Sequence, residues 1–296
     1  MMAVGFIGVG IMGGAIATRM IENGIPVIAY DKNPEALERL RERGAAPADS
    51  VRHVVDQAEV VFACLPTSEV SWAVAAGTDG VAGGSKVKVY VETSTLGGAM
   101  AVKLSEALAK SGITYLDSAV VGGVVALQAG TLGVLAAGPK AAFERVKPAF
   151  DSFAGRVFYL GETVGQAQVG KVVANAVGYA ALFASFEAVS VGLKAGIDIE
   201  TLVAIINQGS GANFHTQRVF PTYIIPGQFH GTGAVEIGVK DVKLFLAEAT
   251  RLNAKTPMAS AVSALSIRAA ESGPPGRDTM TLFHYFCDLA GVPRRG

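Results

Sequence analysis

Residues 4–31 decide the fold of this 296-residue chain, and they read VGFIGVGIMGGAIATRMIENGIPVIAYD. The apolar run Val4–Ile7 precedes glycines at positions 8, 10 and 13, and a helical pattern of apolar residues then continues to Gly24. A second apolar run ends at Asp31. This order of strand, glycine-rich turn, helix and strand predicts a βαβ unit.

The glycines follow the G-x-G-x-x-G spacing of a dinucleotide-binding turn. Gly8 permits the tight turn, Gly10 leaves room for a pyrophosphate against the backbone, and Gly13 lets the helix lie close to the strand. The helix start, with Ile11 and Met12, offers unpaired N–H groups to the phosphates. We therefore expect a bound dinucleotide.

Asp31, at the tip of the second strand, predicts which dinucleotide binds. A carboxylate at this place accepts hydrogen bonds from the adenine-side ribose and repels a 2′-phosphate. The sequence therefore favours NAD over NADP, and the neighbouring Lys32 softens that preference without reversing it.

Composition excludes several classes of protein. The chain has 25 basic and 25 acidic residues and no basic run, which argues against nucleic acid as a partner. Its two cysteines, Cys64 and Cys287, are far apart and predict no disulfide. We expect no metal, because no histidine–carboxylate cluster has ligand spacing. The chain begins directly with the first strand, and we expect a cytoplasmic protein without a signal peptide.

The alternation of strands and helices predicts a doubly wound parallel sheet with helices on both faces, followed by an all-helical part. We expect a Rossmann domain at residues 1–162 and a helical domain at 163–296, with one long helix at 165–195. Ser68 is the expected N-cap of a helix after the third strand. The apolar stretch 172–193 could suggest a membrane span, but the polar Asn175 and Glu187 within it favour a helix buried inside protein. Further expected strands are 59–65, 87–92, 114–117, 131–137 and 157–160.

Hydride transfer between a nicotinamide and a carbonyl requires a proton donor near the reacting oxygen. Lys171 begins the most apolar helix, where desolvation and a neighbouring cation would both lower the pKa of its amine. Asn175 lies four residues later on the same helix face and could orient a substrate hydroxyl. The pattern alone equally allows Lys171 to extend its amine to solvent.

Several ordered blocks resemble the β-hydroxyacid dehydrogenase family, which includes 3-hydroxyisobutyrate dehydrogenase and tartronate semialdehyde reductase. They are GFIGVGIMG, CLPTS, ETST, GQAQVGKVVAN and VKDVKLFLAEA, and they extend over essentially the whole chain. The resemblance implies a Rossmann domain plus a helical domain built on one long interdomain helix. It also implies that Lys171 is the general acid and base and that Asn175 orients the oxygen. The positions implied to contact cofactor are Leu65, Pro66, Val70, Thr95 and Lys240.

The substrate loop departs from the family pattern D-A-P-V-S-G-G. Here residues 117–123 read DSAVVGG, so Val121 stands where the family has a substrate-binding serine. The stretch ALQ at 126–128 likewise replaces the usual G-A-E. The backbone N–H groups of Gly122 and Gly123 could still hold a carboxylate. A bulkier or less polar substrate is therefore expected.

These observations predict a dehydrogenase that interconverts a small 3-hydroxyacid and its semialdehyde. The alternatives are a tartronate semialdehyde reductase, an imine reductase, which commonly has aspartate or tyrosine in place of Lys171, and a non-catalytic dinucleotide-binding scaffold. 6-Phosphogluconate dehydrogenase is a longer relative, and this chain has no evident phosphate-binding basic cluster.

The segment 209–233 is expected to be the least regular part of the chain. Four of its side chains could reach the site, namely Asn213, Phe214, His215 and Gln217, although a histidine such as His215 is more often a surface or core residue. Arg218 could bind a carboxylate with two hydrogen bonds, but a solvated arginine is the more common case. The helical domain is too apolar to cover itself, which predicts a homodimer or homotetramer. The apolar positions are Val172, Val173, Val177, Leu182, Phe183 and Phe186.

Overall fold

The computed structural model describes residues 3–294 and shows two compact units, which divide between Lys171 and Val172. This division lies inside helix α8 (Gln166–Lys194), later than the expected boundary after Glu162. The first turn of α8 belongs to the first unit, where the buried Gln168 donates a hydrogen bond to Asp117.

The first unit is built on an eight-stranded sheet with the order β3-β2-β1-β4-β5-β6-β7-β8. Val4 of β1 lies between Val27 of β2 and Val60 of β4, and all three strands run in parallel. The strands are β1 (Val4–Ile7), β2 (Val27–Tyr30), β3 (Ala46–Pro47), β4 (Val60–Ala63), β5 (Val89–Glu92), β6 (Thr114–Val121), β7 (Gly133–Ala137) and β8 (Arg156–Tyr159).

The β6–β7 pair is the exception to the expected parallel sheet, because these two strands are antiparallel. The sequence predicts an end of this strand at Asp117, but β6 continues to Val121 and so extends past the end of β5. The chain then returns through the short helix α6 (Gly123–Gln128). Such a short return joins antiparallel neighbours, whereas parallel neighbours need a longer crossover.

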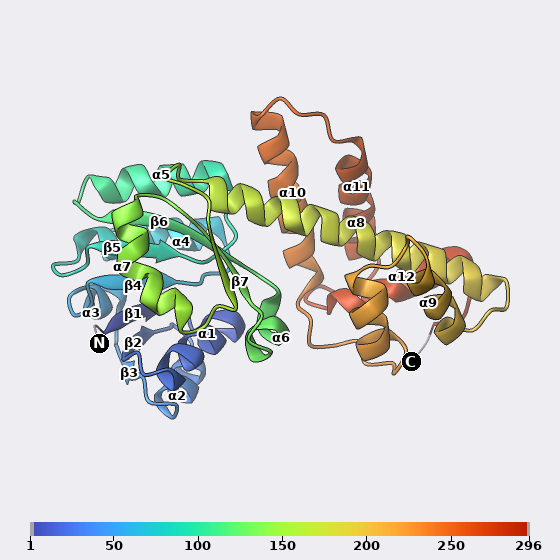
Figure 1. Cartoon of the computed structure of the whole chain (residues 1–296), viewed down its shortest axis with the longest axis horizontal. Helices are drawn as coiled ribbons and strands as arrows, with labels where there is room; N and C mark the ends of the chain where they lie inside the picture. Colours follow the sequence, from blue (N-terminus) through green and yellow to red (C-terminus); the bar gives the residue numbers. More distant parts are fainter. Residues whose placement is uncertain (1–2, 295–296) are drawn as a thin grey trace. The chain divides into compact units, whose positions relative to one another are not determined.

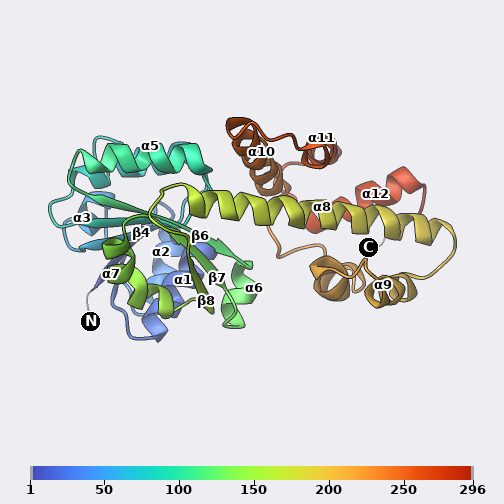
Figure 2. The same ribbon diagram turned by 45° about the horizontal axis from the view of Figure 1, so that its top comes forward.

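Helices cover both faces of this sheet, and each face has its own apolar core. Figures 1 and 2 show α5 over one face, with α1 and α2 over the other. The face with α1 also carries α6 and α7, and the opposite face carries α3, α4 and α5. The remaining bounds are α1 (Ile11–Glu22), α2 (Pro34–Arg41), α3 (Val51–Val55), α4 (Ser68–Ala76), η1 (Val81–Gly83), α5 (Gly98–Ala109) and α7 (Lys140–Asp151).

Polar side chains cap three of these helices. Asn33 accepts a hydrogen bond from the backbone N–H of Glu35, and Ser50 accepts one from His53. The expected cap of α4 was wrong by one residue, because Thr67 accepts from the backbone N–H of Val70. Ser68 is instead the first residue of α4.

The second unit is helical and packs around phenylalanine rings. Phe186 of α8 lies 5.7 Å from Phe220 and 5.3 Å from Phe283, measured between ring centroids. The segment 209–233 contains a π-helix, η2 (His215–Ile224). The other elements are α9 (Ile199–Gln208), α10 (Val235–Arg251), α11 (Pro257–Glu271), η3 (Thr279–Thr281) and α12 (Leu282–Ala290).

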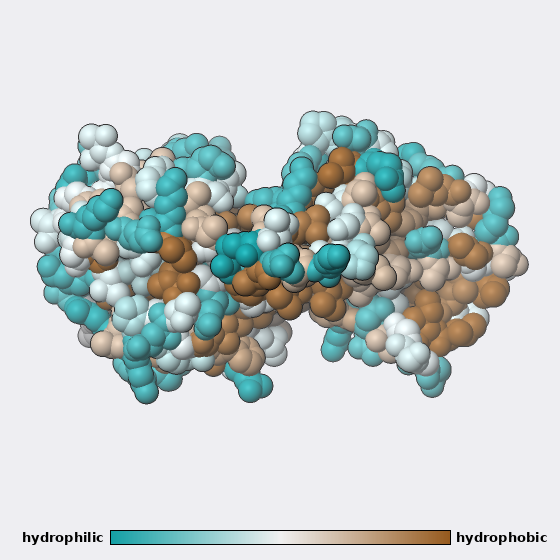
Figure 3. Space-filling view, turned by 90° about the horizontal axis from the view of Figure 1, so that it is seen from above, coloured by the Kyte–Doolittle hydropathy of each residue, from teal (hydrophilic) through white to brown (hydrophobic). Residues whose placement is uncertain are grey.

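Among the described residues, α8 is the one helix long and apolar enough to span a membrane by length and composition. Its side chains divide between a core face and an exposed face. Leu182, Phe183 and Phe186 are buried in the core of the second unit, whereas Val173 and Val177 are 46% and 68% exposed. Apolar residues reach the surface of this unit, on the right of Figure 3.

Candidate active site

The three glycines of the first turn have three different environments. Gly8 has a φ of +86°, and a Cβ there would lie 2.4 Å from the carbonyl oxygen of Cys64. A Cβ on Gly13 would lie 2.0 Å from the carbonyl oxygen of Gly8, so α1 needs glycine to pack against the turn. A Cβ on Gly10 would have no heavy atom within 4 Å. This open backbone at a helix start is a cradle that suits a pyrophosphate.

Asp31 lies directly beside this turn. Its Oδ2 accepts a hydrogen bond of 2.7 Å from the backbone N–H of Val9, and its Oδ1 accepts one of 2.8 Å from Asn33. The carboxylate therefore anchors the glycine turn to the end of β2. Each carboxylate oxygen has a second lone pair, which stays free to accept a ribose hydroxyl.

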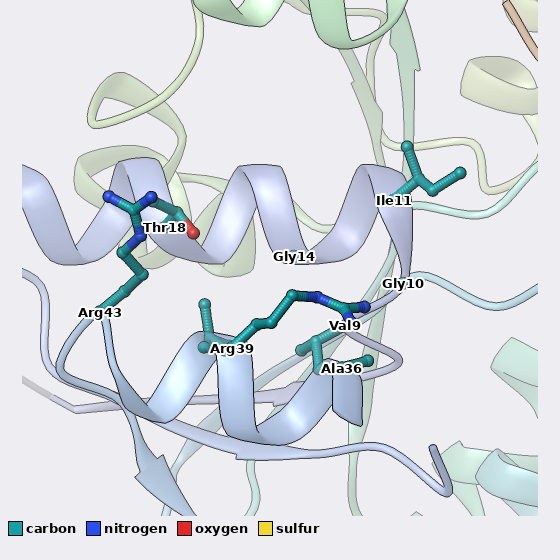
Figure 4. Close-up of a pocket in the computed structure, with 9 residues that line it drawn as sticks. Val9, Gly10, Ile11, Gly14, Thr18, Ala36, Arg39 and Arg43 are labelled. Atoms are coloured by element: carbon teal, nitrogen blue, oxygen red, sulfur yellow. The ribbon is translucent and has the colours of Figure 1, made fainter. Parts of the chain in front are cut away.

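A pocket of about 310 Å³ lies between α1 and α2, next to Gly10. Figure 4 shows that Arg39 of α2 extends toward Gly10 and Val9, while Arg43 lies near Thr18. The exposed guanidinium of Arg39 thus lies near the turn that suits a pyrophosphate. An arginine beside a dinucleotide site is a suitable partner for a phosphate.

The loops after β4 and β5 are tied to each other. The backbone N–H of Leu65 donates to Ser94 Oγ at 2.7 Å, and Thr93 Oγ1 donates to the carbonyl of Ala63 at 2.6 Å. Pro66 is exposed, whereas Val70 and Thr95 are half-buried. These loops follow parallel strands, so they meet the glycine turn at the same edge of the sheet.

Behind these loops lies a buried carboxyl, Glu92. Its Oε1 accepts hydrogen bonds from the hydroxyl and the backbone N–H of Ser94, and its Oε2 accepts one from Tyr90. Burial raises the pKa of Glu92 to about 7, and the hydrogen bonds from Ser94 oppose that rise. The group supports the loop from inside and faces no solvent.

Asp117 of β6 caps the start of α8. Its Oδ2 accepts hydrogen bonds from the backbone N–H groups of Gly165, Ala167 and Gln168, at 2.9, 3.0 and 3.3 Å. These are N–H groups that a helix start leaves without partners. Burial raises the pKa of Asp117 to about 6, against the lowering effect of these hydrogen bonds. The half-buried Lys171 follows within the same helix.

Residues 117–123, which depart from the family's substrate-loop pattern, form the end of β6 and the start of α6. Val121 pairs with Gly133 of β7. The Val121 side chain fills the space beside this glycine, because a Cβ on Gly133 would lie 2.5 Å from Val121 Cγ2. Gly122 and Gly123 follow with φ values of +113° and +67°, and both are exposed. Their positive φ values turn the chain sharply from strand to helix.

In the second unit, Asn175 is held by a carboxylate. Its Nδ2 donates to Oδ2 of the buried Asp241 at 2.7 Å, and Lys240 Nζ lies 3.3 Å from Asp241 Oδ1. A carboxylate only accepts hydrogen bonds, so the amide nitrogen of Asn175 must face it. The amide oxygen of Asn175 then points elsewhere. Burial and the charge of Asp241 also raise the pKa of Tyr179 well above its usual value.

Of the side chains expected to reach the site from segment 209–233, His215 and Asn213 contact α8. His215 Nε2 donates to the carbonyl of Gly178 at 2.8 Å, one turn after Asn175 on α8. Burial lowers the pKa of His215. Asn213 binds within its own unit, donating to Ser185 Oγ at 3.1 Å. Phe214, Gln217 and Arg218 are exposed.

Sequence reasoning assigned no role to Glu92, Asp117, Gln168 or Asp241. Three of them lie within the blocks ETST, GQAQVGK and VKDVK, which contain Glu92, Gln168 and Asp241. The sequence therefore gives the positions of these three residues but not the groups to which they hydrogen bond. Across residues 3–294, no group of three or more His, Cys, Asp and Glu side chains is placed to hold a metal ion.

Two family models together extend over most of the chain. Residues 3–161 match the NAD-binding domain of 6-phosphogluconate dehydrogenase. Residues 165–286 match the domain described as NAD-binding of NADP-dependent 3-hydroxyisobutyrate dehydrogenase. The chain belongs to the β-hydroxyacid dehydrogenase family. It is an NAD(P)-dependent dehydrogenase that acts on hydroxyacids, and the glycine cradle fits that cofactor.

Relatives of this β-hydroxyacid dehydrogenase act on different acids. The 3-hydroxyisobutyrate dehydrogenase of Pseudomonas aeruginosa is 32% identical over 262 residues, which span 86% of this chain and 88% of the relative. The 2-(hydroxymethyl)glutarate dehydrogenase of Eubacterium barkeri is 26% identical over 99% of this chain and 97% of its own.

Solved structures give the same fold. The crystal structure of 3-hydroxyisobutyrate dehydrogenase from Salmonella typhimurium has a TM-score of 0.86 and 26% identity, and it covers 96% of this chain and 100% of its own. An imine reductase of Streptomyces aurantiacus is 20% identical with a TM-score of 0.66, over 96% of this chain and 98% of its own, and it shares the fold alone.

Proposed function

We propose that this β-hydroxyacid dehydrogenase interconverts a small 3-hydroxyacid and its semialdehyde, with Lys171 as general base and general acid. The observation that carries the proposal is the hydrogen bond between Asn175 and the buried Asp241. It holds the amide of Asn175 in one orientation, four residues after Lys171 on the same helix.

The cofactor supplies the hydride acceptor for oxidation and the hydride donor for reduction. In oxidation, Lys171 Nζ accepts the proton of the substrate hydroxyl while the carbinol carbon loses its hydride. In reduction, the protonated Lys171 returns that proton to the carbonyl oxygen. Asn175 orients this oxygen through its amide, and the backbone N–H groups of Gly122 and Gly123 bind the carboxylate of the acid.

NAD is the preferred cofactor in this proposal. Gly8, Gly10 and Gly13 receive its pyrophosphate, together with the N–H groups at the start of α1, and Asp31 binds the adenine-side ribose. Arg39 beside the turn and Lys32 give NADP a weaker but measurable affinity. The positions that line the rest of the cofactor path are Ile11, Met12, Leu65, Pro66, Val70, Thr95 and Lys240.

We further propose a cytoplasmic homodimer or homotetramer. The exposed apolar side chains of the second unit support this assembly, since Val177 is 68% and Met258 is 69% exposed. Sedimentation velocity across a concentration range measures the subunit number.

The test is Lys171→Ala, assayed by nicotinamide absorbance with a panel of semialdehydes, ketoacids and cyclic imines. We expect kcat to fall 10²- to 10⁴-fold, roughly the contribution of a positioned acid or base. The dissociation constant of NADH, measured by its fluorescence, stays within about twofold of the wild-type value. Lys194→Ala is the matched control, because this lysine ends the same helix. Unchanged kcat for Lys171→Ala refutes the assignment.

Val121 favours a second candidate, an imine reductase. Without the hydroxyl of the family's serine, the loop suits a less polar substrate than a short hydroxyacid. Turnover of cyclic imines without turnover of semialdehydes identifies this activity. Bound NADH with no turnover in the whole panel identifies a dinucleotide-binding scaffold.

A further inference from the structure

The side-chain amide of Gln168 connects two loops of the first unit with the start of α8. Gln168 is fully buried, and both atoms of its amide make two hydrogen bonds. Oε1 accepts from the backbone N–H groups of Leu96 and Gly97, at 2.8 and 3.2 Å. Nε2 donates to the carbonyl of Ser94 at 3.1 Å and to Asp117 Oδ1 at 3.0 Å. An amide has two donor hydrogens and an oxygen with two lone pairs, so every position is used.

These bonds enclose Thr95 on both sides. The carbonyl of Ser94 precedes Thr95, the N–H of Leu96 follows it, and the same amide binds both. The loop that carries Thr95 is therefore fixed relative to the first turn of α8. A buried amide whose four bonds are all made has one orientation, since turning it would place donor against donor.

Lys171 follows Gln168 by three residues on the same helix, which corresponds to a rise of about 4.5 Å. The carboxylate of Asp117 also holds this turn, because it accepts hydrogen bonds from the backbone N–H groups of Gly165 and Ala167. The backbone position of Lys171 therefore depends on two anchors, of which only Gln168 reaches the loop of Thr95.

We propose that Gln168 is a positioning residue for hydride transfer, which holds the backbone that carries Lys171 at a fixed place relative to the loop of Thr95. This inference rests on the proposed role of Lys171. Its physical basis is that a displacement of about 1 Å at a reacting centre can lower the rate roughly 10²-fold without weakening ligand binding.

The first experiment compares Gln168→Leu with Gln168→Glu. The leucine removes all four hydrogen bonds, and we expect a 10- to 100-fold lower kcat with the NADH dissociation constant within about twofold. The glutamate restores the shape, and its protonated form restores one donor toward Asp117. We therefore expect its kcat, relative to wild type, to exceed that of the leucine variant and to rise as the pH is lowered from 8 to 6. Gln166→Leu is the control, because Gln166 is exposed on the same turn.

The result that overturns the inference is a Gln168→Leu enzyme with a lower melting temperature but unchanged kcat for its folded fraction. Such an enzyme would show that the amide only stabilises the fold. A loss of kcat equal in the leucine and glutamate variants at every pH also contradicts it, because hydrogen bonding would then have no role.

A double-mutant cycle with Lys171→Ala separates this inference from the proposed function. If Gln168 acts through Lys171, Gln168→Leu lowers the residual rate of Lys171→Ala by less than about threefold. Rate losses that multiply contradict the role of Gln168 and leave that of Lys171 standing. Wild-type turnover by Lys171→Ala instead contradicts the proposed function itself.

Discussion

The carboxylate of Asp31 accepts a hydrogen bond of 2.7 Å from the backbone N–H of Val9, inside the glycine turn. One side chain thus fixes the turn and, in the proposed function, also presents its negative charge to the adenine-side ribose. The two roles are separable, because an amide in place of the carboxylate keeps an acceptor for Val9 but loses the charge.

Asp31→Asn should therefore relax the cofactor preference. We expect the ratio of kcat/KM for NAD to that for NADP to fall at least about tenfold, since the repulsion of a 2′-phosphate is removed. Parallel assays with both cofactors measure this ratio. Asp56→Asn is the matched control, because its carboxylate also accepts a backbone N–H, from Ser85 at 2.7 Å. An unchanged ratio would remove Asp31 from cofactor selection.

Asp241→Ala should impair catalysis through Asn175. The lost bond joins an amide to a charged carboxylate, and such bonds are worth about 1.5–3 kcal/mol, which corresponds to a roughly 10- to 100-fold lower kcat. Steady-state kinetics and thermal unfolding are measured together. Asp198→Ala serves as the control, since Asp198 caps α9 in the same unit and should affect stability alone. A folded Asp241→Ala enzyme with normal kcat contradicts this role.

Val121→Ser restores the hydroxyl that the family places at this position. We expect kcat/KM for 3-hydroxyisobutyrate to rise about 10- to 100-fold, because a hydroxyl donates a hydrogen bond that valine lacks. A substrate panel with the wild type and the variant measures the change. Val125→Ser, at a 63% exposed position on α6, is the control. A fall in activity toward short hydroxyacids would show that the loop of this enzyme serves a different substrate.

Glu92 makes stability depend on pH. Burial raises its pKa from 4.5 to about 7, so between these values the folded protein retains a proton that the unfolded chain releases. The stabilising contribution of the retained proton is complete below pH 4.5. It falls by about 1.4 kcal/mol for each pH unit between pH 4.5 and about 7, and it is lost above that pH.

Glu92→Gln cannot ionise and should weaken this dependence. We expect its free energy of unfolding in urea to fall less than that of the wild type between pH 5 and pH 8. Part of the fall in unfolding free energy remains in this variant, because burial raises the pKa of Asp117 as well. Glu106→Gln, at an exposed position, should behave like the wild type. Equal declines in wild type and Glu92→Gln would rule out the titration of Glu92.

The class of fold followed from local patterns. The glycine spacing, the apolar runs and the long apolar stretch each act over a few neighbouring residues, and the observed β1, α1 and α8 lie where these patterns predict them. Local patterns failed at β6, which continues past Asp117 and reverses into an antiparallel pair. Strand pairing depends on the segment that returns beside it, and the periodicity of one strand contains no information about its neighbour.

The sequence by itself determined a glycine turn at the start of a helix, an acid at the tip of the second strand, and a lysine and an asparagine one turn apart on a long helix. Each of these is a spacing within one element or between two adjacent ones. Only the tertiary structure decided which groups hold them: Gln168 meets Asp117 across 51 residues, and Asn175 meets Asp241 across 66. The reason is physical, since a buried polar group must find a partner wherever the fold brings one, and that place is unrelated to distance along the chain.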